Sequence, residues 1–172
     1  MYAFNYHKPT SLKEAAAMLA ENPDGKILSG GHTLLPAMKL RLAGPSDLVD
    51  LNGIAELRGL ERKGDTISIG ALMRHHEVAE SDVVKSAIPT LAEAVGTIGD
   101  PAVRHRGTIG GSIANNDPSA DYAAAALALG ATIVTHKRSI PADEYFQGLF
   151  TTALDEGEIV TRVEFPIPKR AG

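Results

Sequence analysis

The sequence contains no cysteine. The chain therefore supplies neither a disulfide nor a thiolate ligand for an iron–sulfur cluster or a structural zinc ion. Tryptophan is absent, aromatic residues make up only 5% of the chain, and no apolar run approaches the ~20 residues that a membrane span needs. Neither sign of charge dominates, because 17 Lys and Arg face 21 Asp and Glu for a net charge of -4. This balance provides no general attraction to nucleic acid or anionic lipid.

The composition that remains is that of a folded globular protein. Hydrophobic residues make up 44% and charged residues 22% of 172 residues, which excludes a disordered tail, a coiled coil and a collagen-like repeat. The length suits one domain built from two small lobes. The first residues, Met1 to Tyr6, lack the basic-then-apolar pattern of a secretory signal. We therefore expect a cytoplasmic protein.

The first lobe is predicted to span residues 1–55 as a small βαβ unit. Strong helix formers follow Thr10 and Ser11, either of which can cap a helix over 12–20. The apolar segments 26–28 and 47–51 are predicted strands, and a helix over 34–42 crosses between them.

The second lobe, residues 56–172, is predicted to contain a mainly antiparallel sheet with flanking helices. The alternation in 58–62 and 66–70 around the turn at Lys63 to Asp65 predicts a hairpin. Helical spacing then predicts helices over 73–80, 86–98 and 119–129. Later apolar runs predict strands over 132–135 and 159–165. The fold class is therefore α+β, with two lobes and no regular βαβ array.

Two glycine pairs stand out because each follows an apolar stretch: Ser29-Gly30-Gly31-His32-Thr33 and Thr108-Ile109-Gly110-Gly111-Ser112. Glycine allows close backbone approach and lets successive N–H groups point at one anion, while Ser and Thr add hydroxyl donors. We predict that both segments converge on one phosphate-containing ligand. Neither matches the Gly-x-Gly-x-x-Gly or Walker signature. For either segment alone, an ordinary tight turn is an equally good interpretation.

Other polar motifs favour no catalytic chemistry. His75 and His76 point about 100° apart if they lie on a helix, so they cannot share a metal ion without further ligands. No nucleophile elbow is present, and His32 is interpreted as a neighbour of a cofactor rather than as a general base. Arg104 and Arg106 are interpreted as surface or partner contacts rather than as counter-charges. We predict no catalytic residue and no metal ligand in this chain.

The two glycine segments and their surroundings resemble a known family. Residues 27–41 and 98–118 are similar to the FAD-binding (PCMH-type) domain of the molybdenum hydroxylases. The resemblance is greatest to the medium, flavoprotein subunits of the carbon monoxide dehydrogenase and xanthine dehydrogenase type. Tyr6 to Pro9, the hairpin and Tyr145 to Phe150 follow the same pattern in order, so the resemblance covers nearly the whole chain.

The resemblance implies that FAD lies between the two lobes. It places Asp121 on the ribityl chain, Ile98 against the flavin ring, and Ile159 or Val160 on the adenine side. The residues that it implies around the pyrophosphate are Ile27, Leu28, Ser29, Gly30, Gly31, His32, Thr33, Leu34, Thr108, Ile109, Gly110, Gly111 and Ser112.

The resemblance also implies a role in electron transfer. FAD would take electrons from an iron–sulfur small subunit, which received them from a molybdopterin large subunit, and would pass them to an external acceptor. Relatives continue past Phe165-Pro166-Ile167-Pro168 into a C-terminal domain that this chain is expected to lack. A partner chain, or a second copy in a homo-oligomer, could cover the surface left open. No nucleic acid and no membrane span are expected.

Two other functions remain open at this stage. A truncated FAD- or nucleotide-binding module could serve as an interaction subunit without turnover of its own. A flavin reductase related to the cell-wall enolpyruvyl-glucosamine reductases would share the flavin-binding fold. That enzyme would need an acid or base beside the flavin, and the sequence nominates none.

Overall fold

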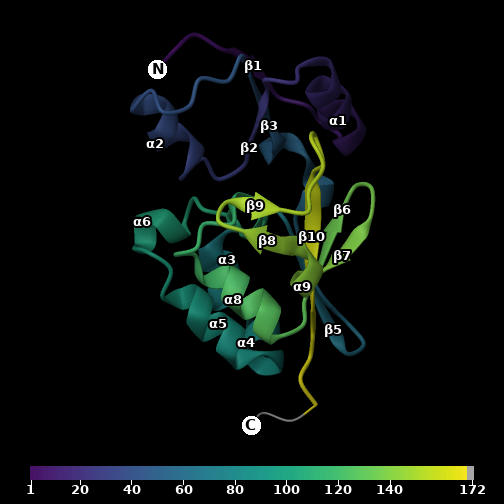
Figure 1. The fold of residues 1–172 in the computed structure, drawn as a ribbon. Coiled ribbons are helices and arrows are strands. Elements are labelled where there is room, and N and C mark those ends of the chain that lie inside the picture. The colour runs from purple at the N-terminus through teal and green to yellow at the C-terminus, as the bar shows by residue number, and fades with distance from the viewer. Residues whose placement is uncertain (170–172) are drawn as a thin grey trace.

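A computed structural model describes residues 1–169 of the chain (Figure 1). The N-terminal part forms a three-stranded parallel sheet in the order β1-β3-β2. The hydroxyl of Ser11 accepts a hydrogen bond from the backbone N–H of Glu14 and thereby caps the first helix, as predicted. The elements of this part are β1 (Asn5–His7), α1 (Leu12–Glu21), β2 (Lys26–Leu28), α2 (Leu34–Lys39) and β3 (Asp47–Asp50).

The second sheet has five strands in the order β4-β5-β10-β6-β7, and every neighbouring pair is antiparallel. The last of these strands in the chain lies at the centre, and its alternate residues Val163 and Phe165 are completely buried. The strands are β4 (Leu60–Lys63), β5 (Thr66–Gly70), β6 (Thr132–Thr135), β7 (Ser139–Pro141) and β10 (Val160–Pro166). A separate hairpin joins β8 (Phe146–Gly148) to β9 (Thr151–Thr152).

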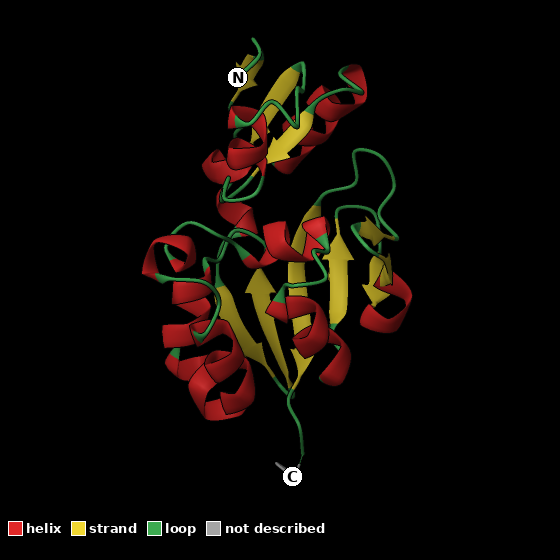
Figure 2. Cartoon of the chain, turned by 60° about the vertical axis from the view of Figure 1, so that its left-hand side comes forward, coloured by secondary structure: helices red, strands yellow, loops and turns green. Residues whose placement is uncertain are grey.

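Short helices pack against the larger sheet, while the smaller sheet lies above it (Figure 2). They are α3 (His75–Glu80), α4 (Asp82–Ala87), α5 (Pro89–Gly96), α7 (Ile109–Asn115), α8 (Asp121–Ala128) and α9 (Ala142–Tyr145), while α6 (Pro101–Arg104) lies against α3. Two 3₁₀ turns, Leu51–Gly53 and Ala55–Leu57, lead from β3 to β4. The chain thus has the α+β architecture predicted from the sequence.

The hydrophobic core has two parts. One cluster fills the space between the larger sheet and helices α3, α4, α5, α7 and α8. The other contains Ala15, Leu19 and Val49 from the smaller sheet and its helix, together with Leu72 and Ile159 from the larger part of the chain. Because this second cluster draws on both parts, apolar packing as well as the chain connection joins the two sheets.

Several local predictions were wrong in detail. The second glycine segment, for which a tight turn was one interpretation, is the start of helix α7, which Thr108 caps. The predicted helix 86–98 begins earlier and is broken at Ile88, since Pro89 disfavours helical geometry in the residue before it. The predicted helix 34–42 ends at Lys39. The short elements β1, α6, β7, β8, β9 and α9 were not predicted.

Candidate functional site

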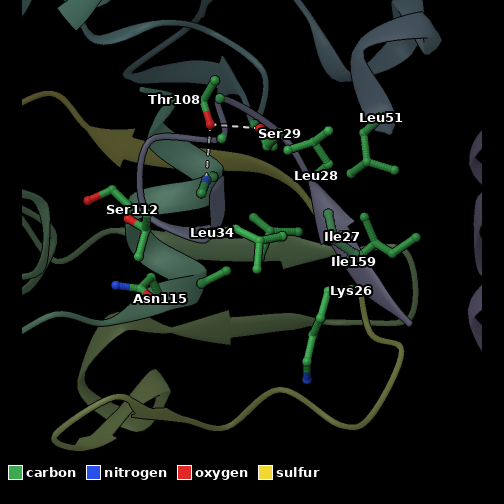
Figure 3. Close-up of a pocket in the computed structure, with 18 of the residues that line it drawn as sticks. Lys26, Ile27, Leu28, Ser29, Leu34, Leu51, Thr108, Ser112, Asn115 and Ile159 are labelled. Carbon is green, nitrogen blue, oxygen red and sulfur yellow. Dashed lines mark hydrogen bonds between the residues drawn. The ribbon is translucent and has the colours of Figure 1, made fainter. Parts of the chain in front are cut away.

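A large cavity lies where the two sheets face each other. Its volume is about 840 Å³, which falls within the range of ~300–1,000 Å³ that is usual for small-molecule and cofactor sites. Its walls come from β2 and the following loop, from helix α7, and from the loop that precedes β10. Lys26, Ile27, Leu34, Ser112 and Ile159 are among the side chains that line it (Figure 3).

The two glycine segments meet at this cavity, as predicted. A Cβ on Gly30 would lie 2.2 Å from the carbonyl oxygen of Arg106 and 2.9 Å from the Cα of Gly107. Only glycine permits this approach, because real Cβ contacts are not so short. The loop after β2 and the segment before α7 are therefore in direct backbone contact, although 76 positions separate Gly30 from Arg106 in the sequence.

The hydroxyl groups of Ser29 and Thr108 stabilise the same contact between the two segments. Ser29 Oγ and Thr108 Oγ1 share a hydrogen bond of 2.8 Å, and Thr108 Oγ1 also accepts one of 3.2 Å from the N–H of Gly111 (Figure 3). Thr108 thus caps helix α7 and holds the loop of the smaller sheet with one oxygen atom. A Cβ on Gly111 would lie only 2.9 Å from this oxygen and 3.8 Å from Ser29 Cβ.

The first segment presents backbone donors to the cavity. Within residues 1–169, no acceptor takes a hydrogen bond from the N–H groups of Gly30, Gly31, His32, Thr33 or Leu34. These five residues line the cavity, and Gly31 has a φ of +74°, a left-handed conformation that favours glycine. A run of unpaired N–H groups on a glycine loop is an arrangement that binds anions.

The second segment does not present its amides in the same way, which corrects the prediction that both segments grip one anion through N–H groups. The N–H of Ile109 donates to Met73 O and that of Gly110 to Ala71 O, while Gly111 and Ser112 donate to Thr108. Helix formation and close packing consume these donors. What α7 offers the cavity instead is side chains, including Ser112 and Asn115 (Figure 3).

A chain of polar side chains braces the first loop. Asn52 Nδ2 donates to the carbonyl of Ser29 at 2.9 Å, and the backbone N–H of Asn52 donates to Asp50 Oδ1, also at 2.9 Å. Tyr6 OH donates to Asp50 Oδ2 at 2.5 Å. Burial opposes the charge on Asp50, but these hydrogen bonds outweigh it and lower the pKa of its carboxyl group. The charged form of Asp50 thus holds β1 and the loop in place.

An ion pair shapes the opposite wall. The side chain of Glu158 is completely buried and accepts hydrogen bonds from Arg138 Nη2 at 2.9 Å and from Thr135 Oγ1 at 2.6 Å. The hydrogen bond from Arg138 is the main reason why the pKa of Glu158 falls to about 2. Arg138 also donates to the carbonyl of Ala153. The pair therefore fixes both ends of the loop 153–158, whose residues 155–158 line the cavity.

Most of the residues selected from the sequence do line the cavity, including all of 27–34, Thr108, Gly110, Gly111, Ser112 and Val160. Three do not. Ile109 is completely buried in the core, Ile98 packs partly buried against that core, and Asp121 is exposed in the first turn of α8. Ser119 and Ala120, which precede Asp121, do reach the cavity.

Arg104, interpreted from the sequence as a surface or partner contact, is half-buried and also has an internal role. Its Nη1 donates to the carbonyls of Ile98 and Gly99, at 3.0 and 3.2 Å. The guanidinium thereby closes the chain between α5 and α6 rather than facing the cavity.

Several residues of the cavity wall were not predicted from the sequence. Leu51, Leu72 and Asn115 were not selected, and His75 was considered only as a metal ligand. Nothing in the sequence distinguishes Leu51 and Leu72 from other apolar residues, because the packing of the two sheets decides which apolar side chains reach the cavity. Asn115 lies one helical turn after Gly111, so the α7 helix, had it been predicted, would have placed both on one face.

Residues 2–168 match the family described as the FAD binding domain in molybdopterin dehydrogenase. The chain is 44% identical over 168 residues to the carbon monoxide dehydrogenase medium chain of Hydrogenophaga pseudoflava, covering 95% of this chain and 58% of that one. It is 41% identical to the glyceraldehyde dehydrogenase medium chain of Sulfolobus acidocaldarius, covering 95% and 60%. The chain thus spans about three-fifths of the length of these relatives.

Solved structures agree with this similarity. The structure of the Hydrogenophaga pseudoflava carbon monoxide dehydrogenase that lacks the Mo-pyranopterin moiety superposes with a TM-score of 0.93 over 95% of this chain and 59% of that chain. The UDP-N-acetylenolpyruvylglucosamine reductase of Thermus caldophilus superposes with a TM-score of 0.58 at 22% identity, covering 95% of this chain and 56% of that chain. The latter likeness shows a shared fold alone.

Proposed function

Because the chain belongs to the family of FAD-binding domains in molybdopterin dehydrogenases, we propose that it holds FAD along the cavity between its two sheets and serves as the flavin-bearing electron-transfer part of a molybdenum hydroxylase complex. The observation that carries this proposal is a run of five N–H groups on the glycine loop, Gly30 to Leu34, that have no acceptor in the described part of the chain and lie at the wall of a cavity of cofactor size. A diphosphate is the part of FAD that such donors recognise.

The other residues of the cavity fit FAD as well. Ser112 and Asn115 on α7 offer side-chain donors on one side of the cavity, and Ile27 and Ile159 offer apolar surface on the other (Figure 3). We assign the diphosphate to residues 27–34 with Thr108, Gly110, Gly111 and Ser112, and the adenine to the end near Val160. Contacts from Ile98 to the flavin ring, from Asp121 to the ribityl chain and from Ile109 to the pyrophosphate remain predictions.

The proposal assigns residues 1–55 to the smaller FAD-binding lobe and residues 56–172 to the larger one. Bound FAD supplies the electron-carrying chemistry. This chain orients the FAD and keeps it between the lobes. The hydrogen bond between Ser29 and Thr108, and the one from Asn52 to the carbonyl of Ser29, fix the positions of the groups that would contact the cofactor.

The electrons would come from a partner. The sequence has no cysteine, so iron–sulfur clusters must lie on an iron–sulfur small subunit, and the substrate would be oxidised on a molybdopterin large subunit. Several relatives are named as medium chains or subunits of dehydrogenases, which supports such an assembly. No helix within residues 1–169 is long and apolar enough to cross a bilayer. We place the complex in the cytoplasm.

The test is direct. The purified protein is titrated with FAD, and binding is followed by the flavin absorbance that stays with the protein after gel filtration. We expect saturable uptake of one FAD per chain. A protein that remains colourless with excess FAD would contradict the proposal. Co-purification with an iron–sulfur chain and a molybdenum chain encoded nearby would support the electron-transfer role, and a flavin-loaded chain that joins neither would contradict it.

A further inference from the structure

His75 is a buried polar side chain of the cavity wall to which neither the sequence nor the family similarity gave a role in binding. It is the first residue of α3, its exposed fraction is only 5%, and it lines the cavity. Its backbone N–H donates to the carbonyl of Gly107 at 3.0 Å. It therefore belongs to the same junction at which Gly30 meets the segment before α7.

Gly107 separates the imidazole ring from the glycine loop. A Cβ on Gly107 would lie 2.4 Å from Nε2 and 2.8 Å from Cδ2 of His75, while a Cβ on Gly30 would lie 2.9 Å from the Cα of Gly107. The ring thus lies against the backbone that carries the contact between the two glycine segments. The absence of a side chain at Gly107 makes room for the Nε2 edge of the ring.

The two ring nitrogens have different surroundings. Nδ1 is completely buried and has no hydrogen-bond partner within residues 1–169. No protein group described here accepts a hydrogen bond from Nε2 either, but Nε2 is not sealed off in the same way, and the ring borders the cavity. The ring packs at a tilt against Tyr122, with 5.3 Å between ring centroids. The hydroxyl of Tyr122 is also buried and, within residues 1–169, makes no hydrogen bond with Nδ1 or any other group.

The imidazole is neutral in this position. Burial, with a smaller contribution from the charge of His32, lowers the pKa of His75 to about 4. A neutral imidazole carries one proton, on either nitrogen. An unpaired N–H in an apolar interior is rarer than an under-satisfied acceptor, so the proton belongs on Nε2 and the lone pair on Nδ1.

We propose that His75 is a further FAD-binding residue, whose Nε2–H donates a hydrogen bond to an acceptor atom of the cofactor where the two glycine segments meet. This inference rests on the proposed function. It explains why a histidine, with one unpaired nitrogen, occupies a position that an apolar residue would fill at lower cost. A neutral donor there adds to the backbone donors of Gly30 to Leu34 without a second buried charge.

The test compares His75→Gln, His75→Leu and the control His76→Leu by FAD titration near neutral pH. Gln can place its amide N–H near the position of Nε2, whereas Leu fills the volume without a donor. The control His76 stacks on His105 and does not line the cavity. We expect the dissociation constant for FAD to rise about tenfold in His75→Leu. It should stay within about threefold of the wild type in His75→Gln and be unchanged in His76→Leu.

A second measurement separates binding from a purely structural role. The thermal midpoint of the FAD-free protein should be equal or higher in His75→Leu, because that substitution removes an unpaired buried nitrogen. The ¹⁵N spectrum of the histidine rings in FAD-free protein should show His75 protonated at Nε2 only.

Several results would overturn the inference. They are unchanged FAD affinity in His75→Leu, affinity in His75→Gln as weak as in His75→Leu, or a proton on Nδ1. These outcomes refute the role of His75 while the wild type still binds FAD. A wild type that binds no FAD refutes the proposed function itself, and the role of His75 with it.

Discussion

The two glycine pairs look alike in sequence but use glycine for different physical ends. In the first, Gly30 and Gly31 belong to a loop that lines the cavity, and no group within residues 1–169 accepts a hydrogen bond from their amides. In the second, Gly110 and Gly111 lie in the first turn of a helix and their amides are already paired, and the missing side chains allow close packing against Ala71 and the hydroxyl of Thr108. Within residues 1–169, the first pair keeps its donors free of protein acceptors, whereas the second uses its donors and its lack of side chains for packing.

The largest expected effect comes from placing a charge in the second segment. In Gly111→Asp the new carboxylate lies beside Ser29 at the cavity wall, where it would repel a diphosphate. We expect FAD affinity to fall by about 100-fold or more, which retained flavin absorbance would measure. Gly96→Asp is the control, because a Cβ on Gly96 meets nothing within 4 Å. Equal loss in both variants would show that the site of the charge does not matter.

Gly110→Ala tests whether the second pair serves packing. Its Cβ would lie 2.5 Å from the Cβ of Ala71 and 2.8 Å from the carbonyl that accepts the Gly110 N–H. We expect the free energy of unfolding of the FAD-free protein to drop by about 3 kcal/mol, as measured by chemical denaturation. Gly96→Ala, with open space around its Cβ, should be neutral or slightly stabilising. A stable Gly110→Ala protein would contradict the packing role.

The pH dependence of stability tests the buried histidine beneath this junction. The pKa of His75 is about 4 in the folded chain and ordinarily 6.5, so below pH 6.5 the unfolded chain binds a proton that the folded chain refuses. The stability that the neutral form of His75 provides to the folded chain is therefore fully present above pH 6.5, and it is lost as the pH falls toward 4. Near about pH 5, we expect the wild type to have lost about 2 kcal/mol relative to His75→Leu. If the unfolding free energies of the two proteins changed in parallel with pH, His75 would not be the group that titrates.

The smallest expected effect concerns the hydroxyl pair that joins the two segments. Ser29→Ala removes one partner of the 2.8 Å hydrogen bond, whereas Thr108→Val also removes the cap on Gly111. We expect losses in unfolding free energy of about 0.5–1 and about 1–2 kcal/mol, respectively. A double-mutant cycle should give a coupling of about 1 kcal/mol. Full additivity of the two losses would show that the hydroxyls do not interact.

Much of this fold follows from local pattern. Ser11 before a run of helix formers, and the alternation in residues 66–70, predicted α1 and β5 because capping and strand periodicity are local effects. Helix α7 was missed because its two glycines are poor helix formers, and tertiary packing of Gly110 against Ala71 outweighs that preference. The three-residue strand β1 was missed because it owes its existence to pairing with β3, a distant partner.

The residues of the candidate site likewise divide into those that the sequence predicted and those that only the structure identified. Residues 29–33 were selected because a glycine-rich loop after a strand has a recognisable chemistry, whereas Ile27, Leu28 and Leu34 were implied by the family resemblance; all of them line the cavity. Leu51, Leu72 and His75 were not found as site residues because burial and cavity exposure depend on how the sheets pack. Ile109, by contrast, was selected from the sequence but does not line the cavity. It lies within a segment that borders the cavity, but the helical turn directs its side chain into the core.

By itself, the sequence determined the α+β class, the absence of any thiolate ligand in this chain and the presence of two glycine segments able to approach another backbone closely. These properties depend on residue type and short-range order. Only the tertiary structure decided which amides remain free and which are used in packing, because a donor is available only when no other part of the folded chain accepts from it. The same reason explains why the unpaired nitrogen of His75 became visible only in the folded molecule.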